Sequence, residues 1–282
     1  MVFEQLYSAD YLRKRPKYGF LLGIGYTILG LFLAIMMFRD DPALIAVGIT
    51  ALFLIPCLYQ LSTAAEVTER KLPNLKAFIL HVIPYVKVYV YVFFGIFFTF
   101  AAFAIFLPKL AAGHLFEQQL SIIMAGKATS FSWTLFWDLY TWNLQVLMLC
   151  FVLSLIAGNG AILFIAWNAS VWGTIFGTLA KTAALASQAN PLIIFLLVIL
   201  SVFPHTLLEG LSYMLATISG TVLSDGLVRE KMASKNMWII FKYNAILFAI
   251  SLGILFIGML VETYVLTNFT TYRTIIEIAF PR

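Results

Sequence analysis

Residues 139–180 read LYTWNLQVLMLCFVLSLIAGNGAILFIAWNASVWGTIFGTLA, and no Asp, Glu, Lys or Arg interrupts these 42 residues. A transmembrane helix needs about 20 apolar residues to cross the ~30 Å hydrocarbon core of a bilayer, so this stretch is long for one crossing. Gly158-Asn159-Gly160 lies near its centre, where two glycines leave helical geometry at little cost. We therefore predict a break at 158–160. Whether the stretch crosses once, crosses twice or includes a re-entrant half-helix stays open.

The composition extends this pattern to the whole chain. Of its 282 residues, 62% are hydrophobic and 11% are charged, against roughly 25% charged in a typical soluble domain, and the mean hydropathy is +0.96. A soluble globule of this size cannot hide so much apolar surface, but lipid can surround it. The numbers exclude a water-soluble enzyme, a disordered regulator and a nucleic-acid-binding protein, despite the net charge of +5. We predict an all-α, polytopic transmembrane helix bundle in the lipid bilayer.

Shorter charge-free runs give the other crossings. Four of them fit one crossing each: 18–38, 42–65, 88–108 and 243–261. The stretch 182–224 contains a single charge, Glu209. Its Asn190-Pro191 is typical of a helix start with proline in the first turn. Pro204 removes a backbone donor, so we expect a kink, a break or a re-entrant segment near 204.

The basic residues predict the orientation, because Lys and Arg gather in cytoplasmic loops. Twelve of the 18 fall into three groups, within residues 13–17, 70–87 and 225–242. If all three groups lie inside, residues 139–224 cross an odd number of times. We therefore predict seven crossings of the cell membrane, with the N-terminus cytoplasmic and the C-terminus external. Six crossings is the alternative.

No extramembrane segment is long enough to fold alone, so we expect residues 1–282 to form a single transmembrane domain. Residues 1–17 are expected to form an N-terminal interfacial segment, with Ser8 as a helix cap and its basic residues near anionic headgroups. Residues 109–138 are expected to form an external interfacial loop, because they lead into an aromatic cluster typical of the membrane boundary. Cys57 and Cys150 fall inside predicted crossings, so we expect no disulfide.

Glu209 is the costliest residue of the predicted crossings. A carboxylate at mid-bilayer costs about 2.5–3.5 kcal/mol on insertion scales, so we expect it to face the interior of the bundle. His205 lies four residues earlier, on the same helical face. With Asn159 and Asn168 these residues form a predicted intramembrane polar site, and we expect Asn168 and Glu209 to lie in one cluster. The alternative is that they are hydrogen-bonded pairs that only fix helix packing.

The same residues are too few for metal chemistry. A catalytic zinc needs three protein ligands, and His205 and Glu209 supply two. The chain also lacks the phosphate-binding, dinucleotide-binding and nucleophile-elbow motifs. We therefore predict no catalytic residue, no metal and no cofactor.

Small residues recur at a spacing of four, which lets two helices approach closely. The pattern occurs at Gly19/Gly23, at Gly173/Gly177 and at Ala216/Gly220/Ser224. We expect these residues to pack helices of the same chain together. A homo-oligomer seam is the alternative.

Two stretches resemble a known family. Residues 157–173, AGNGAILFIAWNASVWG, resemble the glycine-rich break and the W-N-A-S-V-x-G run of the stage II sporulation protein M family, especially its archaeal branch. Residues 204–209, PHTLLE, with ATISG at 216–220, resemble that family's P-H-G-x-x-E helix and its small-residue continuation. Thr206 stands where the family has glycine. Asn168, His205 and Glu209 match the family motifs.

The resemblance implies a multi-pass membrane protein that anchors other proteins rather than an enzyme. The bacterial namesake is associated with cell-wall hydrolases during engulfment, and archaeal-type relatives lack that wall. We therefore predict a non-enzymatic scaffold or partner-recruiting component of the cell envelope, whose partners are other membrane or envelope proteins. The first alternative is a transporter or lipid-handling protein with a mid-membrane cavity lined by Asn168, His205 and Glu209. The second is an intramembrane hydrolase, which lacks a third catalytic group.

Overall fold

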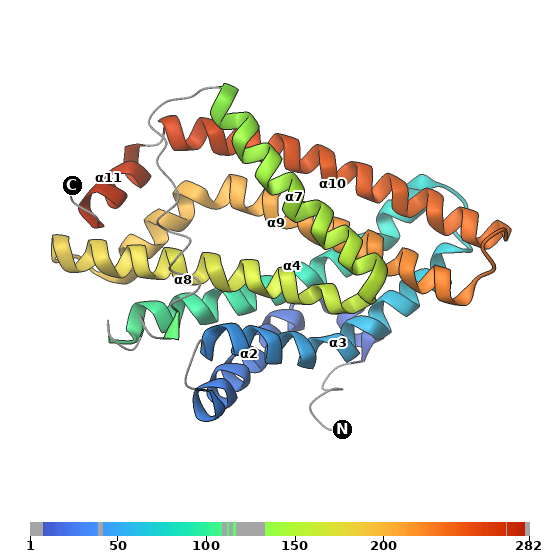
Figure 1. Cartoon of the computed structure of the whole chain (residues 1–282), viewed down its shortest axis with the longest axis horizontal. Coiled ribbons are helices and arrows are strands. Elements are labelled where there is room, and N and C mark those ends of the chain that lie inside the picture. Colours follow the sequence, from blue (N-terminus) through green and yellow to red (C-terminus); the bar gives the residue numbers. More distant parts are fainter. Residues whose placement is uncertain are drawn as a thin grey trace.

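The computed structural model describes residues 8–38, 42–108, 112, 115, 116, 133–268 and 270–279, and these residues form helices joined by short connections. No strand occurs among them, so the all-α prediction is confirmed. The long helices among the described residues are α2 (Tyr18–Met37), α3 (Pro42–Glu69), α4 (Leu75–Phe106), α7 (Trp133–Ala157), α8 (Ile162–Ser187), α9 (Pro191–Arg229) and α10 (Lys235–Asn268). Most of them run close to the long axis of the molecule, and α7 crosses the bundle obliquely (Figure 1). The shorter elements are α1 (Ala9–Lys14), η3 (Gly158–Ala161) and α11 (Thr270–Ala279).

Within the described residues, six helical stretches are long and apolar enough to cross a membrane. They are Tyr18–Met37, Pro42–Glu69, Leu75–Phe106, Trp133–Ser187, Pro191–Arg229 and Lys235–Val265. The fourth stretch is 55 residues long and contains the predicted break. Gly158 there has a φ of +55°, a left-handed conformation that glycine tolerates, and α7 and α8 form a hairpin around it (Figure 1).

The α7–α8 hairpin affects the number of membrane crossings, because the stretch Trp133–Ser187 can cross once or twice. Its arms α7 and α8 have 25 and 26 residues, so each is long enough for a crossing of its own. The polytopic membrane bundle is therefore shown. Seven crossings, with the N-terminus cytoplasmic and the C-terminus external, stay a prediction.

Helix α9 starts as predicted but does not break. Asn190 caps it, because the Asn190 Oδ1 accepts a hydrogen bond of 2.9 Å from the backbone N–H of Leu192. The helix then continues for 39 residues through Pro204, so His205 lies inside it rather than at the start of a new segment. Proline removes one backbone hydrogen bond, and a transmembrane helix tolerates this loss where neighbouring helices support it. Helix α10 packs along α9.

The predicted small-residue spacings bring helices of one chain together. Gly173 and Gly177 lie against the backbone of α4, and Gly220 lies against that of α7. A Cβ atom at Gly220 would lie only 2.6 Å from the carbonyl oxygen of Phe151, so the two backbones are nearly in contact. Ala216 is fully buried. These residues therefore serve packing within the chain, and a homo-oligomer stays an untested alternative.

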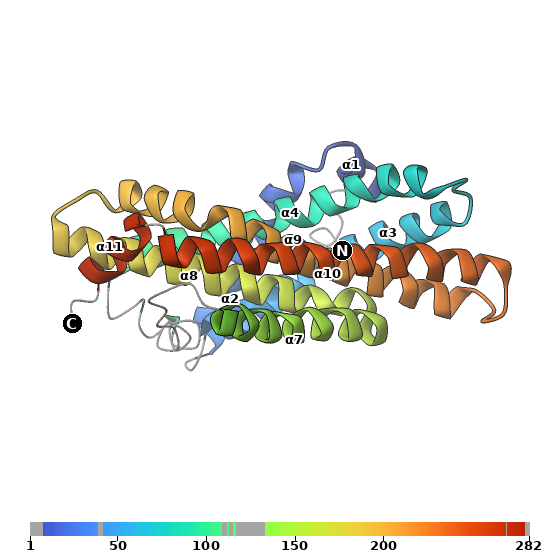
Figure 2. The same cartoon turned by 90° about the horizontal axis from the view of Figure 1, so that it is seen from above.

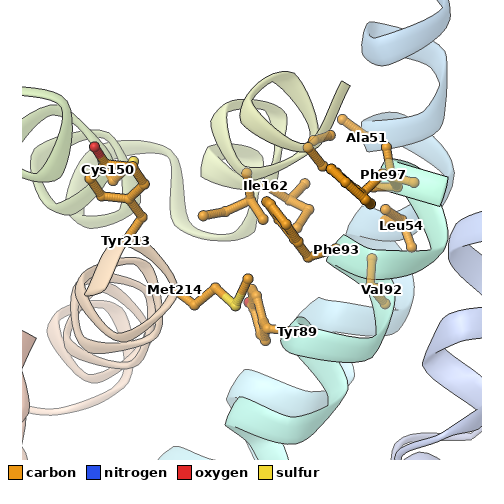
Figure 3. Packing of buried hydrophobic residues seen from close by; sticks show 14 of the residues in the cluster. Ala51, Leu54, Tyr89, Val92, Phe93, Phe97, Cys150, Ile162, Tyr213 and Met214 are labelled. Carbon is orange, nitrogen blue, oxygen red and sulfur yellow. The ribbon is translucent and has the colours of Figure 1, made fainter. Parts of the chain in front are cut away.

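Helix α4 lies at the centre of the apolar core, in contact with α2, α8 and α9. Its Phe93 and Phe97 rings stack with their centroids 6.5 Å apart. Figure 3 shows both rings between the neighbouring helices, and it shows Tyr213 reaching from α9 toward Cys150 of α7. Cys57 and Cys150 are both free and buried.

The two predicted surface segments are described in part. The Ser8 Oγ accepts a hydrogen bond from the backbone N–H of Tyr11 at 3.3 Å, so the predicted cap of α1 is confirmed. Residues 1–7 and most of 109–138 lie outside the described residues. The interfacial position of both segments stays a prediction.

Some helices extend beyond the others at one end of the bundle. We call this the inner end, because it carries the three basic groups predicted to be cytoplasmic. The end of α3, the start of α4, the end of α9 and the start of α10 all reach past the α7–α8 turn there (Figure 2). Helix α1 packs against α3 and α4 at the same end.

Candidate functional site inside the bundle

Glu209 lies in the middle of α9 and faces the neighbouring helices. Its Oε1 lies 3.0 Å from the hydroxyl of Tyr213, one turn later on α9. The same hydroxyl lies 2.6 Å from the Oδ1 of Asn143 on α7, and the Asn143 amide nitrogen donates to Leu139 O and to the Met259 Sδ of α10. A hydroxyl carries one proton, so Glu209, Tyr213 and Asn143 are all satisfied only when the Glu209 carboxyl supplies a second one.

A second carboxylate, Glu262, joins this contact from α10. It lies one turn after Gly258, where a Cβ would be 3.2 Å from the Leu208 Cβ and 3.5 Å from the Glu209 nitrogen. Glu262 is within electrostatic reach of Glu209. Its Oε2 is buried without a hydrogen-bond partner among the described residues. Two carboxylates in hydrocarbon repel each other strongly, so a proton or a cation must offset part of the charge.

We call Asn143, Glu209, Tyr213 and Glu262 the mid-membrane cluster. The sequence reasoning missed three of its four members. Glu262 follows directly after the charge-free run 243–261, so it resembles a residue at a helix end, whereas α10 continues to Asn268. A charged residue inside a long apolar helix was the sequence feature that could have identified Glu262 as a member of the cluster. Asn143 and Tyr213 carried no signal beyond being polar residues within predicted crossings.

His205 and Asn168 do not bond to Glu209. The His205 side chain is 6% exposed, and its Nδ1 has no hydrogen-bond partner within the described part of the chain. The Asn168 amide donates to the Phe164 oxygen of its own helix at 2.9 Å. Glu209 is instead joined to Tyr213, and through it to Asn143. The expected cluster of Asn168 with Glu209 stays a prediction, and the asparagine that the hydrogen bonds link to Glu209 is Asn143.

Asn159 lies at the other polar site, near the inner end. Its amide nitrogen lies 3.0 Å from the Ser62 Oγ of α3, and the Ser62 hydroxyl donates to the Asp225 Oδ2 of α9 at 2.7 Å. Asp225 is 16 residues beyond Glu209 on the same helix, a distance of about 24 Å. The four predicted site residues therefore do not form one site.

The inner-end cluster continues from these residues toward the helix ends. Glu66 is fully buried and accepts a hydrogen bond of 2.7 Å from the Arg70 Nε. The Arg70 guanidinium also pairs with Glu230, after the end of α9, at 2.5 Å. The Asn244 amide of α10 donates to the buried Glu69 at 2.9 Å. We define the inner-end cluster as Ser62, Glu66, Glu69, Arg70, Asn159, Asp225, Glu230 and Asn244.

Neither cluster resembles a metal site. Among the described residues, no group of three or more His, Cys, Asp or Glu side chains could hold a metal ion together. A small crevice of about 50 Å³ lies between α4, α8 and α9. Its wall includes neither Asn168, His205 nor Glu209, and Thr206 supplies its one polar side chain. The mid-membrane cluster therefore does not open into this crevice.

Most of this bundle matches the model of one protein family. The family model of stage II sporulation protein M matches residues 90–266, from within α4 to near the end of α10. The chain belongs to this family. No curated protein and no solved structure matches the chain. The family match includes the whole mid-membrane cluster, whereas Ser62, Glu66, Glu69 and Arg70 of the inner-end cluster precede it.

Proposed function

We propose that this member of the stage II sporulation protein M family is a non-enzymatic scaffold that recruits other membrane or envelope proteins in the cell membrane. The mid-membrane cluster carries the proposal. Its Tyr213 hydroxyl bridges Asn143 of α7 and Glu209 of α9, and the Asn143 amide reaches α10. Polar groups used in this way hold helices in one arrangement, and a scaffold needs a fixed arrangement to present to its partners.

The same geometry is a poor match for a transport site. A transporter places its charged residues where a substrate and water reach them, between broken helices near the membrane centre. Here α9 is continuous through Pro204, and Glu209 takes part in a contact between helices. The crevice beside it is lined by aromatic and aliphatic side chains. This arrangement supports the scaffold over the transporter.

The proposal is tested by purifying the tagged full chain from its own host in mild detergent. We expect the same few membrane or envelope proteins to co-purify in repeated preparations and to be absent with an unrelated multi-pass protein carrying the same tag. Glu209→Gln, which keeps the shape of the side chain, is expected to retain them. Repeated recovery of the bare chain would contradict the scaffold.

One observation favours a second function, proton- or cation-coupled transport. Glu209 and Glu262 are within electrostatic reach of each other, and the Glu262 Oε2 is buried without a partner within the described residues. Such a pair can take up and release a proton or a small cation. The chain in liposomes would then conduct protons or sodium ions above the level of empty liposomes, and Glu209→Gln would abolish the flux. We expect no flux above that background.

A further inference from the structure

The start of helix α2 gives the level of the inner boundary of the hydrocarbon core, and contacts of α2 transfer this level to the neighbouring helices. Its 20 residues have a length of about 30 Å, which matches the hydrocarbon core, and they begin directly after the first basic group. A Cβ at Gly19 would lie 3.0 Å from the Val88 oxygen of α4, so Val88 lies at this boundary. Helix α4 begins at Leu75, so its first 13 residues extend roughly 20 Å beyond the boundary.

Helices α9 and α10 extend beyond the same level. Asn159, Ser62 and Asp225 bond to one another, so Asp225 lies level with the α7–α8 turn. The end of α9 and the start of α10 continue past that turn (Figure 2). The headgroup layer adds only about 5–8 Å on each side of the core. The α3–α4 tip extends farther than this layer, and the Arg70–Glu230 ion pair and the Tyr243–Leu72 hydrogen bond hold the α9–α10 tip against it, so both tips lie beyond the lipid, in the aqueous phase.

At these tips the acidic side chains are largely buried and the lysines are exposed. Glu66 and Glu69 are 0% and 1% exposed, and the Glu230 side chain is 12% exposed. The Arg70–Glu230 ion pair and a hydrogen bond from the Tyr243 hydroxyl to the Leu72 oxygen join the two tips into one surface. Four exposed lysines lie within five residues of Leu72 or Glu230 along the chain: Lys71, Lys76, Lys231 and Lys235.

Exposed apolar side chains lie along the same segments. Val228 is 84% exposed, Met232 77% and Leu80 61%. In the membrane-spanning part of the bundle such exposure is explained by lipid, but these residues lie beyond it. Apolar surface of this kind, bordered by charges and outside the membrane, is typical of a protein interaction site.

We propose that the inner tip surface, formed by Lys71, Lys76, Leu80, Val228, Lys231, Met232 and Lys235, binds an acidic amphipathic segment of a partner protein. The proposal rests on the scaffold function and names where a partner binds. Acidic residues of the partner complement the lysines, and its apolar face covers Val228 and Met232. Anionic lipid headgroups would complement the lysines only at the membrane surface, and they offer nothing to the apolar side chains.

The test uses the full chain in nanodiscs of neutral phosphatidylcholine. The probe is a fluorescent 18-residue peptide with Leu and Glu at helical spacing, which we expect to bind. Reversal of four charges, in K71E/K76E/K231E/K235E, is expected to weaken binding at least tenfold, and a peptide with Lys in place of Glu is expected to restore it. The matched control reverses four exposed basic residues nearer the membrane, in K14E/R15E/K17E/K87E, and should change the affinity less than twofold.

The apolar half of the surface is tested without changing its charge. Val228→Ser combined with Met232→Ser is expected to weaken binding of the acidic peptide about tenfold. Unchanged binding would show a purely electrostatic surface and would overturn the amphipathic partner. A scrambled peptide of the same composition should bind at least tenfold more weakly. Equal binding of the two peptides would also show a purely electrostatic surface and overturn the amphipathic partner.

A spin label at Met232→Cys tests the position of the surface independently of any peptide. We expect the label to be relaxed by a water-soluble nickel complex and not by lipid-dissolved oxygen. The opposite accessibility would place the surface in lipid and overturn the proposal. If the charge-reversed chain binds the peptide like the unmodified one while co-purifying proteins are still recovered, this surface is wrong and the scaffold survives.

Discussion

The mid-membrane cluster and the inner-end cluster join helices of the same bundle with different chemistry. The first consists of an amide, a hydroxyl and two carboxylates, and none of its hydrogen bonds among the described residues involves a cation. The second is centred on Arg70, which pairs with both Glu66 and Glu230. A guanidinium is costly at mid-bilayer, whereas the Arg70 side chain is 24% exposed at the inner end. Depth in the membrane therefore decides whether neutral hydrogen bonds or ion pairs hold the helices.

The two clusters also join different parts of the chain. All four residues of the mid-membrane cluster lie within residues 90–266, which match the family. The inner-end cluster bonds residues before 90 to residues after 220. Arg70, which also holds Glu66, pairs with Glu230, the Ser62 hydroxyl donates to Asp225, and the Asn244 amide donates to Glu69. The first cluster thus stabilises the family core, and the second fastens the N-terminal helices to it.

The largest expected effect comes from removing the cation of the inner-end cluster. Arg70→Met leaves Glu66 fully buried without its partner, and breaking a buried ion pair in this way costs about 3–5 kcal/mol. Because Arg70 is partly exposed, we expect a loss of about 3 kcal/mol in the free energy of unfolding. The measurement is reversible unfolding in mixed micelles.

The matched control is Arg229→Met. Arg229 is exposed and bonds to the Tyr59 hydroxyl and the Thr63 Oγ1, so its loss is expected to cost less than about 1 kcal/mol. Adding Glu66→Gln to Arg70→Met should recover part of the stability, because the unpaired charge is then removed. Equal losses for Arg70→Met and Arg229→Met would show that the buried ion pair has no special role.

A smaller loss is expected at mid-membrane. Tyr213→Phe removes the hydroxyl that joins Asn143 and Glu209, and interhelical hydrogen bonds in membranes contribute about 0.6–2 kcal/mol. We expect a loss of about 1–2 kcal/mol in the same unfolding measurement. Tyr91→Phe on the exposed side of α4 should change stability very little. A loss above that of Arg70→Met would reverse the ranking of the two clusters.

Removing one carboxylate should have opposite signs in the two clusters. Glu230→Gln takes a charged partner from Arg70 and is expected to destabilise the protein by about 1 kcal/mol. Glu262→Gln takes away one of two carboxylates that repel each other and supplies an amide donor, so we expect it to be neutral or to stabilise by up to about 1 kcal/mol. Midpoints of unfolding at one pH compare the two variants directly. Destabilisation by Glu262→Gln would mean that the carboxylate is needed, for example to hold a cation.

The helices were predictable from the sequence because their determinants are local. Absence of charge, the Asn190 cap and the glycines around Asn159 each act within a few residues, and the structure has helices and a break at these places. Pro204 predicted a kink or a break, and the structure has no break there, because α9 continues through it to Arg229. Glu262 was overlooked since its importance depends on the helix that it faces.

The partner of Glu209 could not be predicted for the same reason. Asn143 and Asn168 both lie in the charge-free run 139–180, and each is an amide flanked by apolar residues. The choice depends on how α7 and α8 are rotated about their axes, which side-chain packing across the bundle decides. Tyr213 lies one turn beyond Glu209, and only the position of α7 makes its hydroxyl a bridge.

The smallest expected effect separates these two asparagines. Asn168→Leu removes a hydrogen bond to the Phe164 oxygen of its own helix, an oxygen already positioned to accept a backbone bond, so we expect a change below about 0.5 kcal/mol in the free energy of unfolding. Asn143→Leu, the matched variant, also removes the acceptor of Tyr213 and should cost about 1–2 kcal/mol. Equal losses would mean that Asn168 has a partner in the bundle comparable to Tyr213, and the cluster expected from the sequence would then have to be reconsidered.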